Sequence, residues 1–393
     1  METMDEKTIQ LYSLLIYLTG CALHDVIPDK KYVENMDLKQ LYYATQAQTL
    51  TAMVCMALEW GNAFEHADEN IVLKWREAKD KAIRKNMMLD AMREQIFDKL
   101  EQEKIWYMPL KGSILKSLYP KYGMRQMADN DILIDANGQK KVKEIMEQLG
   151  FETTNFGKGN HDVYEKPPVY NFEMHTSLFG RTNKDAWFLY YGQVKDRLIK
   201  DADNKYGYHF SDEDFYLYMM VHGCKHFEGS GTGLRTLVDT YVYERKKGAQ
   251  LDWDYIEKEA EKLEIAAYET ENKALAGKLF EVPVNPETLW ENLSLEERKA
   301  LNIYIGAGTY GTTEISVKNK LNEFQKEGKI KKETKRKYCW RRLFPDLHWY
   351  EMYEPFIYRH KWLIPFFIPF RVVRGILIKR KKIMAEIKAL RHI

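Results

Sequence analysis

Three short stretches of the sequence carry residue types that bind divalent metal ions and phosphate groups. They are Lys111-Gly112-Ser113, Asp129-Asn130-Asp131 and Glu173-Met174-His175. In a β-strand, residues two apart point to the same face, so Asp129 and Asp131 would project side by side. Carboxylates that close repel each other unless a cation lies between them. Mg²⁺ prefers one or two carboxylates together with phosphate oxygens, so the pair predicts a metal site beside a phosphate group.

The other two stretches can complete such a site. Glu173 lies on an apolar-flanked strand of its own and becomes a third ligand if that strand pairs beside the first. Gly112-Ser113 stands between a predicted strand and a predicted helix, where glycine allows close backbone approach and a helix N-terminus attracts phosphate. Two metals can clamp the attacking and leaving oxygens of an in-line displacement. The ordered combination therefore indicates binding of a triphosphate with a metal.

Several nearby residues have structural alternatives. An exposed lysine at a turn is the alternative for Lys111. His175 shares strand parity with the glutamate two residues before it, so it either lines the same pocket or is a hydrogen-bonded structural histidine. His222 and His226 lie four apart on a predicted helix and can share a metal. The first is followed by glycine, not by the glutamate of zinc proteases, which favours packing or contact with the catalytic region.

The elements that must position these residues follow from hydrophobic periodicity and from turn residues. Strands are predicted at 105–110 and 130–135, followed by three β-leaning pieces at 151–154, 161–165 and 170–178. Short helices are predicted at 114–119 and 138–149, between these strands. The flanking sequence is helical, at 38–60 and 71–103 before the strands and at 212–224, 234–245, 253–263 and 265–279 after them.

This order of elements predicts an α+β fold, with a small mixed β-sheet, N-terminal helices and a helical C-terminal region. At roughly 150 residues per domain, a chain of this length holds two or three domains. We divide the 393 residues into an N-terminal helical region, a catalytic core, a helical domain and a basic, aromatic C-terminal segment, at 1–103, 104–210, 211–310 and 311–393.

The ordered motifs resemble those of the polymerase-β-type nucleotidyltransferase superfamily. More closely, the chain is similar to a bacterial family described as uncharacterised nucleotidyltransferases. The matching residues are Leu110-Lys111-Gly112, Tyr119-Pro120, Arg125, Asp129-x-Asp131-Ile132-Leu133 and Glu173-x-His175, with a weaker echo in 222–226, Arg235 and Asp239. Asn130 stands where the superfamily prefers an apolar residue, and the interval between Ser113 and Asp129 is slightly long.

The resemblance implies a role for each matching residue. Asp129 and Asp131 would bind Mg²⁺, with Mn²⁺ as the alternative ion, and the nucleotide triphosphate. Glu173 would be the third carboxylate, either a metal ligand or the base for the acceptor hydroxyl. The remaining residues would bind the nucleotide: Gly112 and Ser113 at the β and γ phosphates, Lys111 and Arg125 as cations that neutralise phosphate charge, and His175 in the pocket wall.

The reaction implied by the resemblance moves a nucleoside monophosphate from an NTP, such as ATP, to a hydroxyl group and releases pyrophosphate. The acceptor stays open among a small molecule, a sugar, a protein side chain and an RNA end. The alternative is a non-catalytic module of the same fold that engages nucleic acid or a partner protein through the basic C-terminal segment.

The formal net charge of +2 conceals a strong asymmetry along the chain. Residues 317–393 carry 21 Lys and Arg against 7 Asp and Glu, a net of +14, whereas residues 1–316 carry a net of −12. A basic segment interleaved with aromatic residues can bind nucleic acid, an anionic surface or the acidic body. The alternative is a helical segment whose aromatic residues pack on the body and whose lysines are solvated.

The sequence also bears on location. The four cysteines are scattered, without metal-ligand or redox spacing, which is typical of a reducing compartment. No apolar run approaches the roughly 18 residues of a membrane span, and Trp362–Phe370 is interrupted by two prolines. Leu18-Thr19-Gly20-Cys21 resembles a lipoprotein cleavage box, but the residues before it are mainly acidic, whereas a secretory n-region is positive. We predict a packed helix over Leu11–Ala22 and a cytoplasmic protein.

Overall fold

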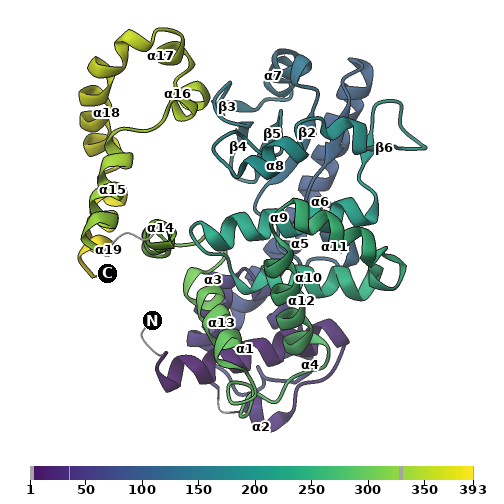
Figure 1. Cartoon of the computed structure of the whole chain (residues 1–393). Helices are drawn as coiled ribbons and strands as arrows, with labels where there is room; N and C mark the ends of the chain where they lie inside the picture. Colours follow the sequence, from purple (N-terminus) through teal and green to yellow (C-terminus); the bar gives the residue numbers. More distant parts are fainter. Residues whose placement is uncertain (1–3, 35, 327–330, 393) are drawn as a thin grey trace.

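The computed structural model describes residues 4–34, 36–326 and 331–392. Its arrangement confirms the predicted α+β class, because helices surround a small mixed sheet (Figure 1). In Figure 1 the sheet lies in the upper part, the first four helices lie at the bottom, and helices from the second half of the chain lie between them.

The N-terminal region is helical, as predicted. Its helices are α1 (Glu6–His24), α2 (Lys30–Val33), α3 (Leu38–Gln48), α4 (Thr51–Trp60) and α5 (Glu69–Gln102). The predicted helical stretch 38–60 is divided into two helices because Thr49 adopts a left-handed conformation, with φ of 52°, and ends α3. Trp75 of α5 packs among the N-terminal helices, whereas Leu89, Ile96 and Leu100 pack against the sheet. Helix α5 therefore joins the two parts of the molecule.

The sheet has five strands in the order β1-β2-β5-β4-β3. The strands are β1 (Tyr107–Pro109), β2 (Asn130–Ile134), β3 (Glu152–Asn155), β4 (His161–Lys166) and β5 (Tyr170–His175). Strands β2 and β5 pair in parallel, with Asp131 opposite Glu173, and the other neighbours are antiparallel. This pairing meets the condition that the sequence set for Glu173 to join the two aspartates.

The two faces of the sheet have different neighbours. Ile132, Phe172 and Met174 pack on α5 and on α7 (Gln139–Gln148). Leu133, on the opposite parity, packs toward α9 (Asp212–Glu228). Asp131, Glu173 and His175 share the parity of Leu133, so strand alternation directs them to the side of α9.

Short elements fill the connections around the sheet. They are α6 (Gly112–Leu115), η1 (Lys116–Leu118), η2 (Ala136–Gly138), α8 (Asp185–Tyr190), η3 (Val194–Arg197), and a two-stranded sheet of β6 (Ile199–Lys200) and β7 (Tyr208–His209). The helix predicted at 114–119 is thus a single α-helical turn followed by a 3₁₀ turn.

The helices after the sheet share a core with the N-terminal helices. They are α9, α10 (Leu234–Lys247), η4 (Gly248–Gln250), α11 (Trp253–Lys262), α12 (Ala266–Phe280) and α13 (Leu295–Ala307). Leu237, Leu279 and Leu301 pack in one cluster with Leu18 and Leu58 from the beginning of the chain. The regions predicted at 1–103 and 211–310 therefore bury apolar surface together, and the four-part division stays a prediction.

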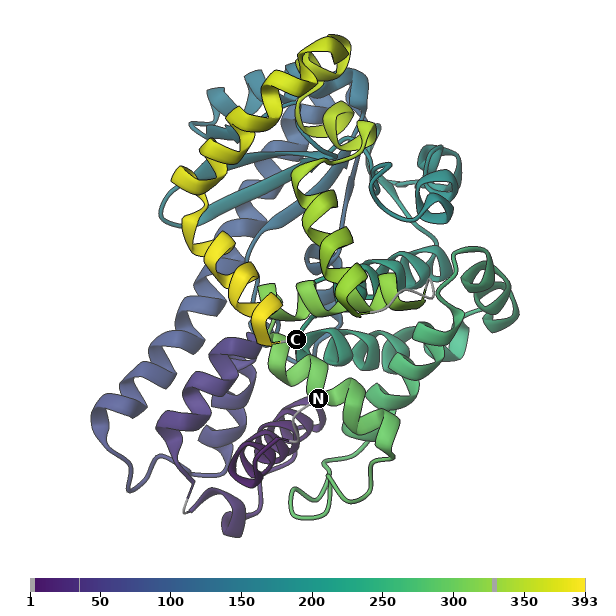
Figure 2. The ribbon, with the colours of Figure 1, turned by 60° about the vertical axis from the view of Figure 1, so that its left-hand side comes forward.

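The C-terminal segment forms an arm of helices along one side of the molecule (Figures 1 and 2). Its elements are α14 (Thr313–Lys326), α15 (Lys331–Leu343), α16 (Leu347–Tyr353), α17 (Pro355–Arg359), η5 (Lys361–Leu363), α18 (Ile364–Ile378) and α19 (Arg380–His392). The two prolines expected to interrupt this stretch do not end α18. Pro365 lies in its first turn, where an N–H has no partner within the helix, and the helix continues through Pro369.

Two further observations concern apolar helices. In the part of the chain that the structure describes, no helix is both long enough and apolar enough to cross a membrane. Cys21, the last residue of the lipoprotein-like stretch, is fully buried inside the continuous helix α1. The stretch is therefore the packed helix that was predicted.

Candidate active site

A cavity of about 320 Å³ lies between one face of the sheet and helices α9 and α10. Seven of the eight predicted site residues line it, namely Lys111, Gly112, Arg125, Asp129, Asp131, Glu173 and His175. They come from the turn after β1, the loop before β2, and strands β2 and β5. Residues separated by more than sixty positions in sequence are thus brought to one place.

Asp131 is the most firmly held residue of the cavity. Its Oδ1 accepts from Lys111 Nζ at 2.9 Å and lies 2.8 Å from His175 Nε2. Burial by itself would raise the pKa of Asp131, but the Lys111 charge and the His175 hydrogen bond outweigh burial and hold this pKa well below its ordinary value. Asp131 is therefore a fixed anion at the floor of the cavity.

Lys111 is not the solvent-exposed lysine of the alternative interpretation, because its side chain is only 22% exposed and is ion-paired. Burial opposes its charge, but Asp131 outweighs burial and keeps the pKa of Lys111 above its ordinary value. Its backbone has φ of 46° and ψ of −115°, a strained conformation for a residue with a side chain. The next strand supports this turn, since Leu110 N donates to Asp131 O at 2.9 Å.

Asp129 is in the opposite situation to Asp131. Burial and the negative charges of Asp131 and Glu173 raise the pKa of Asp129 above its ordinary value. Among the described residues, none donates a hydrogen bond to its carboxylate or forms an ion pair with it. Asp129 is thus a buried carboxylate beside two others, and the cations Lys111 and Arg235 offset its raised pKa only in part.

Glu173 lies between two histidines. Its Oε2 is 3.6 Å from His175 Nε2 and 3.6 Å from His161 Nε2. Within the described residues, these three side chains form the group whose possible metal-ligand atoms all lie within 4.8 Å of one another. The predicted trio of Asp129, Asp131 and Glu173 lines the same cavity but does not form so compact a group.

His161 was not predicted from the sequence. It comes from β4, where it pairs directly with His175 of β5 in antiparallel register. A histidine at the start of a predicted strand was the available signal, but the register that places it beside His175 depends on the turn between the two strands. His175 is buried, and its Nδ1 has no hydrogen-bond partner among the described residues.

The turn after β1 is shaped by packing. A Cβ on Gly112 would lie 2.2 Å from Arg125 Nη1 and 2.7 Å from Met127 Sδ, so only glycine fits. The Ser113 hydroxyl donates to Leu110 O at 2.6 Å, and Ser113 is the one predicted site residue that does not line the cavity. The phosphate contacts expected of Gly112 and Ser113 stay predictions.

Arg125 makes a buried, bidentate ion pair. Its Nε and Nη2 donate to the two carboxylate oxygens of Asp239 on α10, at 2.7 and 2.8 Å. Tyr119 donates its hydroxyl to the same carboxylate at 2.6 Å. The motif residues Arg125 and Asp239 thus pair with each other across the cavity wall. A nucleotide contact of Arg125 stays a prediction.

Helices α9 and α10 add two cations that the predicted site lacked. Lys225 lines the cavity and makes no hydrogen bond or ion pair within the described part of the chain. Burial and the nearby charge of Lys111 lower the pKa of Lys225. Burial and the charge of Arg125 likewise lower the pKa of Arg235, whose Nη1 donates to Gln126 O at 3.2 Å. Lys225 lies within the 222–226 echo of the motif, which was the available signal.

His222 and His226 also line the cavity, and their Nε2 atoms lie 3.1 Å apart. Burial, together with the charges of Lys225 and Lys111, lowers the pKa of His226 to about 4. Burial also lowers the pKa of His222 well below its ordinary value. The pair is therefore neutral near pH 7, and it adds no positive charge to a cavity that already holds several cations.

Helix α5 supports the aspartate loop from behind. Lys85 Nζ donates to Ala128 O at 2.7 Å, and Asn86 Nδ2 donates to Arg125 O at 3.0 Å. Asn130 points to α5 and away from the cavity, where its Oδ1 accepts from Arg93 Nη1 at 3.1 Å. The departure from the superfamily pattern at Asn130 thus has a structural explanation, since the buried Asn130 side chain accepts a hydrogen bond from the half-buried Arg93.

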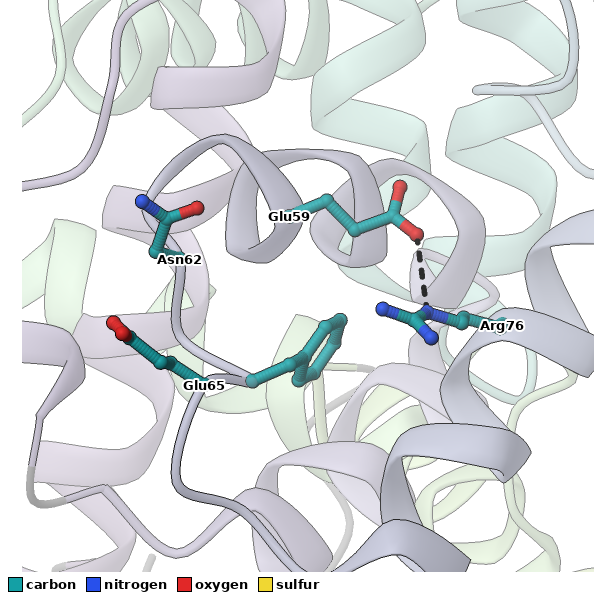
Figure 3. A pocket seen from close by; sticks show the side chains of 5 residues that line it. Glu59, Asn62, Glu65 and Arg76 are labelled. Carbon is teal, nitrogen blue, oxygen red and sulfur yellow. Dashed lines mark ion pairs between the residues drawn. The ribbon is translucent and has the colours of Figure 1, made fainter.

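A second hollow, of about 510 Å³, lies among the N-terminal helices (Figure 3). It is lined by Phe64, Asn62, Glu65 and the loose pair of Arg76 and Glu59, whose nearest atoms are 3.8 Å apart. It contains none of the predicted site residues. Its few polar side chains do not point toward a common centre. The cavity at the sheet is therefore the stronger candidate for the active site.

Residues 34–281 match the protein family described as "Uncharacterised nucleotidyltransferase". The match covers well over half of the chain and includes the sheet, helices α9–α12 and every residue that lines the cavity except Thr309 and Tyr310. No curated protein and no solved structure matches the chain in the other two comparisons.

The Asp239 pair gives a test of the site's architecture. Asp239→Asn leaves the Arg125 guanidinium buried without its counter-charge, and loss of one member of a buried pair typically costs about 3–5 kcal/mol. We expect the free energy of unfolding, measured by urea denaturation, to fall by about that amount. Asp80→Asn, on the exposed surface of α5, is the matched control and should change it by less than about 0.5 kcal/mol.

The buried histidines give a pH prediction. His226 has an ordinary pKa of 6.5 in the unfolded chain and of about 4 in the folded chain. Between these values the unfolded state binds a proton that the folded state does not, so the free energy of unfolding should fall as the pH is lowered from about 6.5 to about 4. Denaturation at several pH values should show that the free energy of unfolding falls less with decreasing pH for His226→Gln than for the exposed control His348→Gln. Equal slopes for the two variants would contradict the burial of a neutral His226.

Proposed function

Because the chain belongs to the family described as uncharacterised nucleotidyltransferases, we propose that it transfers a nucleoside monophosphate from an NTP to a hydroxyl acceptor and releases pyrophosphate. ATP is the first donor to test. The proposed acceptors are a small molecule, a sugar, a protein side chain or an RNA end, each of which offers the required hydroxyl.

One observation carries the proposal, namely the uncompensated charges of both signs in a single cavity. Burial and the neighbouring charges of Asp131 and Glu173 raise the pKa of Asp129, and none of the described residues forms an ion pair with its carboxylate. Lys225 and Arg235 have lowered pKa values and no carboxylate partner in the described structure. A divalent metal bound to a triphosphate supplies a cation for Asp129 and an anion for Lys225 and Arg235. A free metal ion would offer only the positive charge, and a free phosphate only the negative charge.

The carboxylates present suit a divalent metal. Asp129, Asp131 and Glu173 would hold it, because carboxylate oxygens are the ligands that Mg²⁺ and Mn²⁺ prefer. A bound cation would offset the burial and the repulsion by Asp131 and Glu173 that raise the pKa of Asp129. When bound, the metal would neutralise the phosphate oxygens and make phosphorus more susceptible to attack.

The chain's own cations would hold the triphosphate. We assign Lys111, Lys225 and Arg235 to the β and γ phosphates, where negative charge accumulates as pyrophosphate leaves. The backbone of Gly112 offers close approach at the turn, with Ser113 holding the turn through Leu110 O. Arg125 would border the nucleotide with Nη1, while its other two nitrogens hold Asp239.

The acceptor hydroxyl must lose a proton as it attacks phosphorus. Glu173 is the residue we assign to this step, either directly or as a metal ligand that lowers the hydroxyl pKa. Its side chain is 22% exposed, in contrast to 6% for Asp131, so an acceptor can reach it. His175 lies against both carboxylates and would fix their relative orientation.

Asp129→Asn separates catalysis from stability. Removing a carboxylate that two others repel should leave the free energy of unfolding unchanged or raise it. The same change should lower transfer of label from α-labelled ATP to lysate acceptors by about 100-fold or more, with other NTPs tested alongside. Asp80→Asn is the control for both measurements.

Three results would contradict the transferase proposal: no NTP binding in the presence of Mg²⁺ or Mn²⁺, NTP binding without any transfer, or transfer that Asp129→Asn leaves unchanged. The second result would favour the non-catalytic module instead.

The cations of α9 and α10 give a binding test that does not require the acceptor. A hydrogen bond to a charged group contributes about 1.5–3 kcal/mol, so Lys225→Met and Arg235→Met should each weaken Mn²⁺–ATP binding by about tenfold or more in calorimetry. Lys246→Met, on the exposed surface of α10, is the matched control and should bind like the unaltered chain. Unchanged affinity in both cavity variants would place the triphosphate elsewhere.

A further inference from the structure

Helix α18 and the turn before it expose a continuous apolar stripe. Its members lie at helical spacing and are each more than half exposed, namely Trp362 (69%), Phe366 (73%), Phe370 (57%), Val373 (55%) and Leu377 (76%). Spacings of four, four, three and four residues keep them on one side of a helix. Soluble proteins rarely expose a contiguous apolar surface of this kind without a binding role.

Contacts with the rest of the arm hold α18 beside and behind the stripe, on the sides that carry Arg374 and Arg371. Arg371 donates to the carbonyl oxygens of Leu343 and Arg342 at 3.1 and 3.0 Å, and Arg374 pairs with Glu354 at 3.1 Å. These contacts fix the rotation of α18, so the stripe is held outward. In Figure 1, α18 lies on the outer side of the arm, away from the body of the molecule.

The charge around the stripe has one sign. From Pro355 to Ala385 the sequence contains no Asp or Glu and eight Lys or Arg. Lys379, Arg380, Lys381 and Lys382 follow the stripe directly, and Arg359 and Lys361 precede it, all of them exposed. The apolar stripe is thus bordered at both ends by cations.

This combination selects among possible occupants. If the stripes of two copies of the chain packed against each other, the cationic borders of both copies would lie together and repel. Nucleic acid matches the cations, but its phosphates offer nothing to aliphatic residues such as Val373 and Leu377. An anionic membrane surface matches both, because headgroups meet the cations and acyl chains accept the apolar stripe.

We propose that α18 docks the protein on anionic membrane surfaces by lying in the plane of the lipid headgroups. Its 15 residues give a length of about 22 Å, shorter than the roughly 30 Å of a bilayer core, so it lies on the membrane rather than across it. Trp362 at one end has the amphipathic ring that favours the membrane–water boundary.

The arm connects this surface to the catalytic cavity. Gly159 N donates to Met352 O of α16 at 3.0 Å, and the next two residues, Asn160 and His161, line the cavity. A Cβ on Gly180 would lie 1.8 Å from the Met352 methyl group, so α16 sits close against the core. Docking through α18 would therefore hold the cavity near the membrane. The proposal does not depend on the transferase activity.

The test is co-sedimentation of the full chain with phosphatidylcholine vesicles, with and without about one third phosphatidylglycerol. We expect binding to the anionic vesicles only, and weaker binding as salt is raised. Replacing Phe366, Phe370 and Leu377 with serine should weaken binding by about tenfold or more. Replacing the four cations at 379–382 with glutamine should weaken it by about a hundredfold or more.

The matched control replaces three equally exposed apolar residues elsewhere, Ile27, Leu189 and Val282, with serine and should bind vesicles like the unaltered chain. Since the substituted stripe residues are mainly exposed, circular dichroism should show a folded chain in every case. No binding to anionic vesicles would overturn the proposal. Vesicle binding that is unchanged in the stripe variant would also overturn it. The same holds if the stripe variant only loses self-association in light scattering, or if the unaltered chain prefers an RNA oligonucleotide to the vesicles.

Discussion

The buried ion pair between Arg125 and Asp239 is the contact on which the cavity depends. Asp239 belongs to α10, which packs with the N-terminal helices, and Arg125 belongs to the loop that carries Asp129. The pair therefore fixes one wall of the cavity against the other. A bidentate geometry is well suited to this, because two parallel hydrogen bonds define orientation as well as distance. The missing side chain of Gly112 provides the space that the guanidinium occupies.

The cavity held by this pair contains buried charges that destabilise the folded chain when no ligand is bound. Asp131 is compensated by Lys111 and His175, whereas Asp129 and Lys225 are not compensated. A protein selected only for stability would neutralise or remove such groups, since an unpaired buried charge opposes folding. Their retention is consistent with a ligand that carries both signs of charge, as a metal-bound triphosphate does.

The C-terminal arm carries the positive charge that the nearly neutral total conceals. The net charge of +2 sums an acidic body and a basic final segment, and the structure separates the two in space (Figure 1). The arm uses Arg371 and Arg374 for its own packing and leaves the cations at 379–382 exposed. Aromatic residues follow the same division, since Tyr350 is buried in the arm and Trp362 is exposed. Internal packing thus describes one face of the segment, and an outward binding surface stays a prediction for the other.

The sequence by itself determined the α+β class, the positions of most strands and helices, and the residues of the carboxylate cluster, because periodicity and side-chain chemistry are local properties. Strand parity alone placed Asp129 beside Asp131 and His175 beside Glu173. Only the tertiary structure decided the register that sets Asp131 opposite Glu173 and His161 opposite His175, since register depends on turns and on the burial of whole strand faces. It also decided the partner of Arg125 and brought Lys225 to the cavity, because contacts between distant helices depend on packing that no local pattern records.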